Sequence, residues 1–434
     1  MNPALPKNGN LTSDVRKGGV KKAGILSLGC PRNLTDSEHL LGKLKKSGYS
    51  IVDIAEAEVA FVNTCAFIED AKAESIEALL DLIELKKEGK LKKIIACGCL
   101  VQRYKDVLEK EFPEIDVFTG TFAFEHSLDR FPITPGHYAY LKICESCLSS
   151  CSFCIIPKIK GKFSSINIES LVKEAKQLEK SGIKELNIIG QDTSSYGLDL
   201  YTKRKLPELL QAILKGTKSI PWIRLLYLYP DIKTIKALLD IMQDEPRVCR
   251  YIDLPLQHIN NRILKLMRRR SNKEEILEII ALIRKNLPDA AIRTSFIVGF
   301  PSESEKEFQE LMHFIEEVKF ERLGVFTYSR EEGTPAYNFK GQLPEATKLA
   351  RLNAVMSRQQ GISIEVNRRM MTRKIDVLID EAKNNTYLGR SRYDAPEVDG
   401  TVYVKSERSL KPGDLVNVEI KDTLEYDLIG EVKK

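Results

Sequence analysis

The sequence lacks any run of about 18–20 apolar residues, the length that a membrane-spanning helix needs. Its first twenty residues carry Pro, Asn, Gly and Lys without an apolar stretch, so we expect no secretory signal and a disordered tail over residues 1–22. A net charge of +6 is too small to demand a nucleic-acid partner, although it permits RNA or a ribosome. We therefore predict no membrane association and a cytoplasmic location.

Composition and length indicate a globular protein of several domains. Apolar residues make up 43% and charged residues 29% of the chain, as in ordinary globular proteins. At 434 residues the chain is too long for one hydrophobic core, so we expect two to four domains. Nine cysteines without a secretory signal favour metal or redox chemistry over disulfides.

A short segment between two apolar runs carries Cys147, Cys151 and Cys154 at the spacing C-x3-C-x2-C. Thiolates this close together can hold three corners of a 4Fe-4S cluster, which leaves one iron open for another ligand. Serines surround these cysteines, which argues against a buried apolar role for them. Cys144 extends the pattern to C-x2-C-x3-C-x2-C, so a zinc site or a four-cysteine cluster remains an alternative.

Three further cysteines follow three strands predicted near the N-terminus. Strands over residues 24–28, 59–63 and 93–96 alternate with helices, which predicts a parallel sheet. Cys30, Cys65 and Cys99 come just beyond these strands, and ligands bind at that edge of an open parallel sheet. We infer a second iron–sulfur cluster there. Cys97 competes with Cys99, but it belongs to the strand and should point to the other face.

The central part of the chain repeats strand and helix about six times. Six such units in some 200 residues predict an incomplete parallel barrel with its site at the C-terminal strand ends. The predicted strands cover residues 138–143, 185–189, 222–227, 251–254, 291–298 and 322–328. Polar residues near the strand ends predict a cofactor site, and Gly299 would allow the backbone to approach an adenine-sized ligand closely. The candidate cofactor residues are Gln191, Asp192, Gln257, Arg293 and Gly299.

The last 60 or so residues alternate apolar and polar positions with period two and predict five short strands. Strands over residues 375–379, 386–389, 398–404, 415–420 and 427–432 suggest a small antiparallel β-barrel of the oligonucleotide-binding kind. Residues 371–434 hold eleven Lys and Arg against thirteen Asp and Glu, which disfavours phosphate binding. We predict that Asp394, Glu397 and Asp399 dock a basic protein. The run Arg268 to Arg270 is interpreted as a solvated helix end.

Several of these motifs resemble those of known enzymes. The three-cysteine pattern with Phe153 before its last cysteine resembles the signature of radical S-adenosylmethionine enzymes, and the string over residues 151–157 resembles that of methylthiotransferases. The stretches 191–197 and 224–230 resemble the subgroup that modifies an aspartate of ribosomal protein uS12 (RimO type). Ser146 and Ser302 stand where the family usually has Gly, and the stretch 160–165 lacks two usual arginines.

The resemblance implies an α/β protein of three domains. They are an N-terminal methylthiotransferase domain over residues 23–124, a partial (βα)6 radical SAM barrel over 137–366 and a TRAM domain over 370–434. It implies two 4Fe-4S clusters and S-adenosylmethionine, with Phe153 among the cofactor contacts. The 5′-deoxyadenosyl radical, and no catalytic side chain, would carry the chemistry at the β-carbon of an aspartate.

The implied partners are uS12, on or near the small ribosomal subunit, and an electron donor such as flavodoxin or ferredoxin. The nearest alternative is the same chemistry on an adenosine of transfer RNA. A non-enzymatic two-cluster electron carrier is a second alternative, but it would need neither the polar barrel rim nor a third domain.

Overall fold

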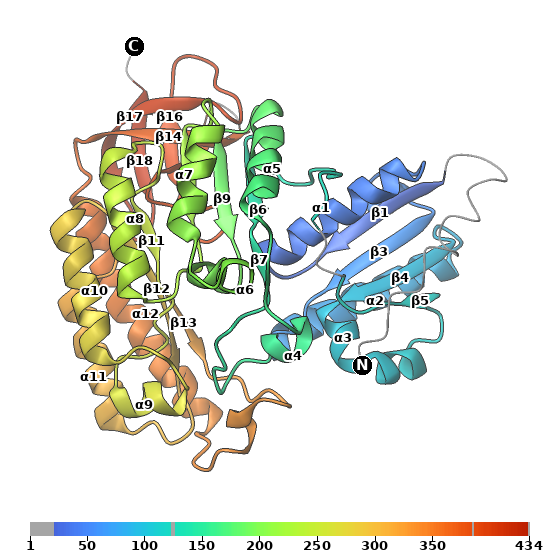
Figure 1. Ribbon diagram of the computed structural model, residues 1–434, viewed down its shortest axis with the longest axis horizontal. Coiled ribbons are helices and arrows are strands. Elements are labelled where there is room, and N and C mark those ends of the chain that lie inside the picture. The colour runs from blue at the N-terminus through green and yellow to red at the C-terminus, as the bar shows by residue number, and fades with distance from the viewer. Residues whose placement is uncertain (1–20, 123–125, 384–385, 433–434) are drawn as a thin grey trace. The chain divides into compact units, whose positions relative to one another are not determined.

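The computed structural model describes residues 21–122, 126–383 and 386–432. The tail predicted over residues 1–22 lies almost wholly outside these ranges. The chain divides into two compact units, one of Met1–Ile133 with Ile155–Ser164 and one of Thr134–Cys154 with Ser165–Lys434 (Figure 1). Within the described ranges, no helix combines the length and the apolar character needed to cross a membrane.

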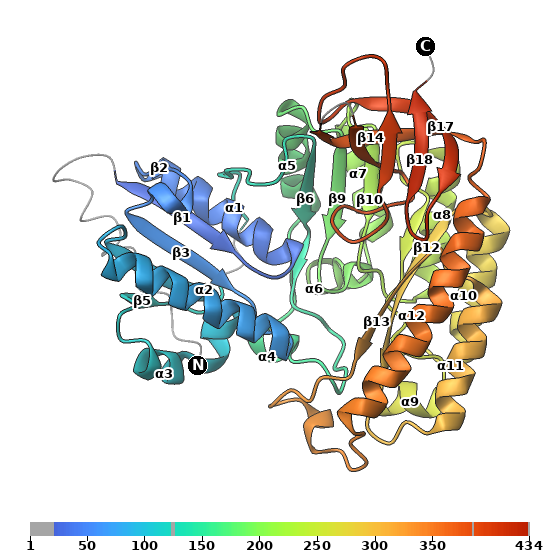
Figure 2. The same ribbon diagram turned by 180° about the vertical axis from the view of Figure 1, so that it is seen from behind.

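Unit 1 contains a parallel sheet covered by helices on both faces. Its strands lie in the order β2-β1-β3-β4-β5. All six residues of β3 are buried, as expected for a central parallel strand. Ala60 and Val62 belong to a core with residues of α2 and α3, whereas Phe61 belongs to a second core with Leu41 and Leu44 of α1. Figure 2 shows α1 and α2 beside the strands of this sheet. The bounds are β1 Lys22–Ser27, α1 Pro31–Lys46, β2 Ser50–Ile51, η2 Ile54–Glu56, β3 Val59–Thr64, α2 Glu69–Lys87, β4 Lys93–Gly98, α3 Cys99–Glu111 and β5 Val117–Phe118.

The short helix α4 (Ile156–Lys160) belongs to unit 1, although it follows the three-cysteine segment directly. Ile155 and Ile159 are buried in the same core as Ala60 and Val62. At the end of the helix, the Lys160 ammonium lies 3.3 Å from a carboxylate oxygen of Asp36. The segment over residues 155–164 therefore packs with the N-terminal sheet, whereas the sequence predicted it within the central barrel.

Unit 2 begins with a partial barrel of six parallel strands, as predicted. The strands form two sheets, in the orders β10-β9-β6 and β11-β12-β13. The amide of Leu228 donates to the carbonyl of Asp253 at 3.0 Å and joins the two sheets. The bounds of the six barrel strands are β6 Tyr138–Lys142, β9 Glu185–Ile189, β10 Trp222–Leu225, β11 Tyr251–Asp253, β12 Ala291–Val298 and β13 Arg322–Thr327. Two further short strands, β7 Cys144–Glu145 and β8 Ser164–Ser165, form a separate pair.

Helices follow the barrel strands, and several begin at capping side chains. Asn272 and Ser304 each form a reciprocal capping box with the glutamate three residues later, which fixes the starts of α10 and α11. The bounds are α5 Ile168–Lys180, η3 Thr193–Ser195, α6 Leu198–Tyr201, α7 Leu206–Gly216, α8 Ile232–Asp244, α9 Asn261–Leu266, α10 Lys273–Asn286, α11 Glu305–Val318, η4 Pro335–Asn338 and α12 Glu345–Arg368.

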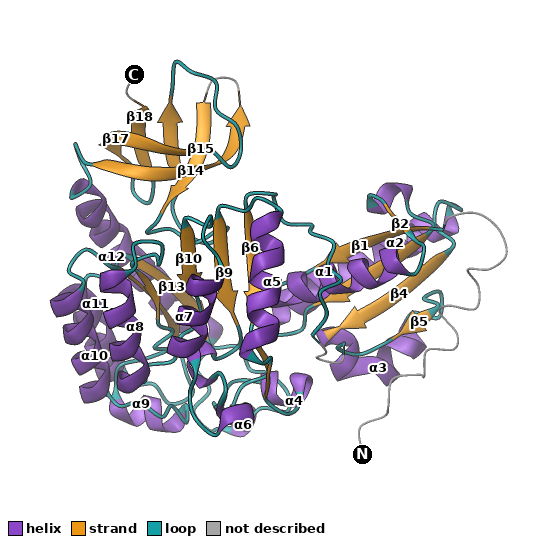
Figure 3. Cartoon of the chain, turned by 45° about the horizontal axis from the view of Figure 1, so that its top comes forward, coloured by secondary structure: helices purple, strands orange, loops and turns teal. Residues whose placement is uncertain are grey.

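The chain ends in a closed five-stranded barrel with the order β14-β15-β16-β18-β17 (Figure 3). Alternating residues such as Val377, Ile379, Val416 and Val418 fill its core. The barrel was predicted to be antiparallel, and only the β16–β18 pair departs from this by running parallel. The bounds are β14 Lys374–Lys383, β15 Thr386–Ser391, β16 Val402–Lys405, β17 Leu415–Thr423 and β18 Leu428–Val432.

The C-terminal barrel is bonded to side chains near the N-terminal ends of the parallel strands. Arg322 of β13 donates from Nε to Oδ1 of Asp394 at 2.8 Å. Nη1 of Arg390 donates to Oε2 of Glu185, the first residue of β9, at 2.7 Å. The hydroxyl of Tyr251 donates to Oδ2 of Asp399 at 2.5 Å. These bonds attach the small barrel to the end of the parallel barrel opposite the C-terminal strand ends.

These contacts correct the prediction of an acidic docking surface. The side chains of Asp394 and Asp399 are only 2% and 3% exposed and are paired within the chain. Glu397 is exposed, but its Oε1 accepts a hydrogen bond from the hydroxyl of Tyr138 at 2.8 Å. The excess of acid in the last domain thus includes carboxylates engaged by the parallel barrel. A count of charges could not show which of them face solvent.

We predict that Asp394→Ala strongly destabilises unit 2. The substitution leaves the mostly buried guanidinium of Arg322 without its carboxylate, and losing one partner of a buried pair costs about 3–5 kcal/mol. Urea unfolding followed by circular dichroism measures the loss. Asp376→Ala, at an exposed position of β14, is the matched control and should change stability by no more than about 0.5 kcal/mol. Equal effects of the two substitutions would contradict this account of the interface.

Candidate functional site

Cys30, Cys65 and Cys99 follow the C-terminal ends of three adjacent parallel strands. Cys30 is the N-cap residue of α1, Cys65 comes directly after β3, and Cys99 is the first residue of α3 after β4. Burial raises the pKa of the Cys99 thiol to about 12, and the nearby thiols of Cys65 and Cys30 add to this effect. The three thiols therefore gather at one sheet edge, as predicted.

Two residues hold these three strand ends close together. Gly29 has a φ of +85°, and a Cβ at this position would lie 2.7 Å from Sγ of Cys65, so any larger residue would displace that thiol. The side-chain amide of Asn33 donates to the carbonyls of Leu28 and Thr64 at 3.1 and 3.2 Å. Its Oδ1 lies 3.9 Å from Sγ of Cys99.

Asn33 was missed by the sequence reasoning. The available signal was its place three residues after Cys30, in the first turn of the helix that follows the strand, where i and i+3 side chains share a face.

The structure separates Cys97 from Cys99. Cys97 is fully buried within β4, and its thiol donates to the carbonyl of Val62 at 3.1 Å. Cys99 instead contacts Asn33 beside the other two thiols. This arrangement agrees with the choice of Cys99 as the third ligand.

Two cationic side chains, Arg32 and Lys160, lie near the N-terminal thiols. Burial opposes ionisation of Cys30, but Arg32, the Asn33 amide and Lys160 outweigh it and hold the pKa of Cys30 below its usual range. A thiol with a lowered pKa is a better metal ligand because the thiolate is the species that binds. Lys160 is one of the residues that replace the arginines usual in the resembling family, so a basic group is retained at that position.

The barrel cysteines lie on the loop that follows β6 and β7. The amide of Ser149 donates to Sγ of Cys147 at 3.3 Å, and the amide of Cys154 donates to the carbonyl of Cys151 at 3.1 Å. Burial raises the pKa of Cys147, and the charges of Asp192 and Cys151 add to this effect. Cys144 points elsewhere, since its thiol donates to the carbonyl of Asp192 at 3.7 Å and fills the space beside Gly190.

Arg269 and Arg270 make contacts within the chain that the sequence-based interpretation of a solvated helix end did not include. Their guanidinium carbons lie 4.2 and 4.3 Å from the centre of the Tyr229 ring. Nη2 of Arg270 donates to Asp192 at 3.1 Å. Arg268 and Arg270 are both exposed, as expected of solvated side chains, whereas Arg269 is half-buried. Aromatic contacts over about 40 residues of separation leave no local pattern in a sequence.

Four non-glycine residues at the C-terminal rim of the parallel barrel have a strained backbone. Ser146, Tyr227, Gln257 and Ser302 all have positive φ values, between 60° and 74°, and each follows a barrel strand or its neighbouring loop. Such residues cost on the order of 1–3 kcal/mol each and cluster at functional sites. Positive φ also explains why glycine is usual at positions 146 and 302 in the resembling family.

The predicted cofactor residues of the second strand end have different surroundings. The carboxylate of Asp192 accepts from the hydroxyl of Ser195 at 2.6 Å and from Arg270, so its bonds hold the rim in place. Oε1 of Gln191 is buried and has no hydrogen-bond partner in the structure. An unpartnered buried acceptor is costly, and a polar ligand at the rim would satisfy it. Gln191 therefore fits the predicted role directly.

Three other predicted cofactor residues, Arg293, Phe153 and Gln257, contact other residues of the chain. Nη1 of Arg293 donates to Asp253 at 3.1 Å, and its Nε lies 3.4 Å from Asp399. Phe153 packs beside a buried cluster that includes Met267 and Phe300. Gln257 lies at the rim, where its backbone bridges to Phe296. Their binding of a cofactor stays a prediction.

Gly299 is explained by packing. Its φ is +72°, and a Cβ here would lie 2.4 Å from Cγ of Lys348 on α12. The predicted approach of an adenine-sized ligand is therefore not needed to account for this glycine.

Each cysteine set has the donor type and number that an iron–sulfur cluster with one open iron needs. Within the described ranges, no three His, Cys, Asp or Glu side chains converge closely enough to hold one metal ion. A cluster of several irons is larger than one ion, so its thiolates need not meet at a point. Three thiols per set match the chemistry of a 4Fe-4S cluster with one open iron.

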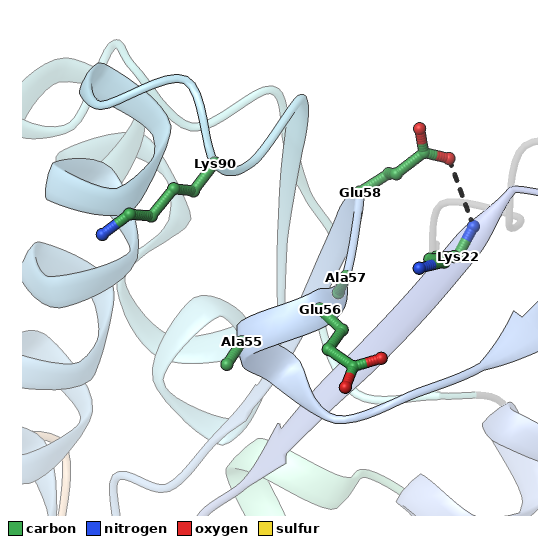
Figure 4. Close-up of a pocket in the computed structure, with 6 residues that line it drawn as sticks. All are labelled: Lys22, Ala55, Glu56, Ala57, Glu58 and Lys90. Atoms are coloured by element: carbon green, nitrogen blue, oxygen red, sulfur yellow. Dashed lines mark hydrogen bonds between the residues drawn. The ribbon is translucent and has the colours of Figure 1, made fainter.

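A shallow hollow of unit 1 lies away from these cysteines. It is lined by Lys22, Ala55, Glu56, Ala57, Glu58 and Lys90 (Figure 4). The backbone amide of Lys22 donates to Oε2 of Glu58 at 3.3 Å. These two residues begin or precede β1 and β3, whereas the thiols follow the opposite ends of the strands. The hollow is not part of the site.

Comparison with protein families divides the chain into three regions. Residues 22–120 match the uncharacterized protein family UPF0004, residues 141–315 match the radical SAM superfamily, and residues 373–432 match the TRAM domain. The first region contains Cys30, Cys65 and Cys99, and the second contains the three barrel cysteines.

Curated proteins align with nearly the whole chain. The chain is 46% identical over 439 residues to the ribosomal protein uS12 methylthiotransferase RimO of Clostridioides difficile (strain 630), covering 95% of this chain and 98% of that protein. It is 45% identical to the protein of the same name from Thermoanaerobacter sp. (strain X514), covering 95% and 100%.

Among solved structures, the chain is similar to the radical S-adenosylmethionine methyltransferase TsrM of Kitasatospora setae. That structure was solved with cobalamin and a [4Fe-4S] cluster bound. The TM-score is 0.54 at 13% identity, over 81% of this chain and 78% of that chain, which shows a shared fold.

We predict that Cys99→Ala removes the N-terminal cluster and that Cys97→Ala does not. Both substitutions remove a buried thiol from the same strand end, so they are matched in size and place. The reconstituted parent should contain about eight irons, and the Cys99 variant about four. Iron and acid-labile sulfide analysis measures the difference. Loss of four irons from the Cys97 variant instead would show that Cys97 is the ligand.

Proposed function

Because the chain belongs to the ribosomal protein uS12 methylthiotransferase family within the radical SAM superfamily, we propose that it adds a methylthio group to the β-carbon of an aspartate in uS12. The observation that carries this proposal is the presence of two three-cysteine sets, each beyond the C-terminal ends of parallel strands. Identity of 42–46% with the named relatives over at least 94% of the chain supports the choice of substrate.

Cys147, Cys151 and Cys154 would hold the cluster whose open iron binds S-adenosylmethionine. When bound, the two groups would supply radical chemistry able to take hydrogen from an unactivated C–H. The strained rim residues shape the loops around the proposed S-adenosylmethionine site. The buried Oε1 of Gln191 can accept a hydrogen bond from an amino group of the ligand.

Cys30, Cys65 and Cys99 would hold the cluster that presents sulfur. The cationic groups of Arg32 and Lys160 stabilise thiolate at Cys30, and Asn33 fixes the strand ends that carry the thiols. A second S-adenosylmethionine would supply the methyl group. The division of six ligands between two sites supports a reaction in which C–H activation and sulfur delivery belong to different clusters.

The proposal implies partners beyond the substrate. Each cleavage of S-adenosylmethionine consumes one electron, so a one-electron donor such as flavodoxin or ferredoxin is required. A ribosomal substrate places the reaction in the cytoplasm, on or near the small ribosomal subunit. Asp394 and Asp399 have no part in binding uS12 in this proposal, because they are buried against the parallel barrel.

Transfer RNA methylthiolation by the same chemistry is not favoured. The named relatives act, by their names, on uS12. The stretch Gln191 to Gly197 at the second strand end also has the residues of the uS12 subgroup.

Mass spectrometry of cells lacking this chain tests the substrate. We expect the aspartate of uS12 to lose its methylthio group and to regain it with the parent chain. Cys151→Ala, which removes a ligand of the barrel cluster, should not restore it. The nucleosides of transfer RNA from the same cells serve as the control and should be unchanged. Intact uS12 modification together with loss of methylthio-adenosine would move the assignment to transfer RNA.

A further inference from the structure

The segment that follows α9 supports the three-cysteine loop from within unit 2. The amide of Ser152 donates to the carbonyl of Met267 at 3.0 Å, and its hydroxyl donates to the carbonyl of Leu266 at 2.7 Å. Ser152 is fully buried between Cys151 and Cys154. These two bonds fix the loop against residues that lead directly into Arg268, Arg269 and Arg270.

Arg269 is held beside the Cys151 thiol by contacts that do not involve sulfur. Its Nη2 donates to the carbonyl of Pro255 at 2.7 Å, and its guanidinium carbon lies 4.2 Å from the centre of the Tyr229 ring. The same guanidinium places Nη1 3.7 Å from Sγ of Cys151, within hydrogen-bond range of a sulfur acceptor. The position of the donor is therefore fixed in advance of cluster binding.

The positive charge of Arg269 is also uncompensated by a carboxylate. Its neighbour Arg270 donates to Asp192 at 3.1 Å, so that pair is close to neutral. In the part of the chain that the structure describes, Arg269 forms no ion pair and its other acceptor is a backbone carbonyl. A full charge therefore faces one ligand of the barrel cluster.

We propose that Arg269 is a positioning residue that donates a hydrogen bond to the Cys151 ligand of the barrel cluster and makes the cluster easier to reduce. This role rests on the proposed function, which assigns the cluster to Cys147, Cys151 and Cys154. Reduction adds one electron from an external one-electron donor and increases the negative charge on cluster and thiolates. Hydrogen bonds and positive charge at the sulfur stabilise the reduced form more than the oxidised form and raise the potential.

The effect is measured with the barrel cluster as the only cluster. The background carries Cys30→Ala, Cys65→Ala and Cys99→Ala, and Arg269→Met is added to it. Methionine keeps much of the side-chain length and can still contact the Tyr229 ring, but it has neither charge nor donor. Arg268→Met is the matched control, because Arg268 is adjacent and exposed. Iron analysis counts the cluster, and a mediated reductive titration followed by electron paramagnetic resonance gives its midpoint potential.

We expect about four irons in every variant. Arg269→Met should lower the midpoint potential by on the order of 59 mV or more, which corresponds to a tenfold change in a one-electron equilibrium. Arg268→Met should leave the potential at the background value. Arg269→Lys should give an intermediate potential, because lysine keeps the charge but not the planar fork that reaches both Pro255 and Cys151.

Three outcomes would overturn the role. Full iron content with an unchanged potential in Arg269→Met would show that the contact does not tune the cluster. Loss of iron from both the Met and Lys variants would show that Arg269 only maintains the loop. A background variant without iron would refute the cluster assignment of the proposed function itself, and the role of Arg269 with it.

Discussion

Parallel strand pairing is the constraint on which both candidate sites depend. Because every strand of the N-terminal sheet and of the central barrel runs in the same direction as its neighbours, residues just beyond the strands meet at one edge. Cysteines more than 30 residues apart in sequence are thereby brought to one place in unit 1. In unit 2 the same geometry gathers the cysteine loop, Gln191 and the strained residues of the rim.

The opposite end of the parallel barrel serves a different purpose. Buried pairs such as Arg322–Asp394 and Arg390–Glu185 bond the first residues of the strands to the small C-terminal barrel. Buried ion pairs add little net stability, because their desolvation offsets most of their attraction, but removing one partner leaves an uncompensated buried charge. The C-terminal barrel is thus bonded to one end of the parallel barrel, while the three-cysteine loop lies at the opposite end.

The strands, and the places of the six candidate cysteines beyond them, could be predicted because periodicity and spacing are local features of the sequence. β9 and β12 match their predicted bounds, and the choice of Cys99 over Cys97 agrees with the geometry. The docking acids could not be predicted correctly, because partners such as Arg322 lie about 70 residues away and a charge count does not report burial. The same holds for Arg269, whose neighbours Tyr229 and Cys151 come from other loops, and for Gly299, whose space is limited by Lys348.

The most direct test of the account asks whether the two cysteine sets have separate tasks. A variant with Cys30, Cys65 and Cys99 all changed to Ala is reduced with dithionite in the presence of S-adenosylmethionine and uS12, and both 5′-deoxyadenosine and modified uS12 are quantified. The account predicts that 5′-deoxyadenosine still forms while no methylthiolated uS12 appears, because the barrel cysteines alone suffice for cleavage. Methylthiolated uS12 from this variant would contradict the account.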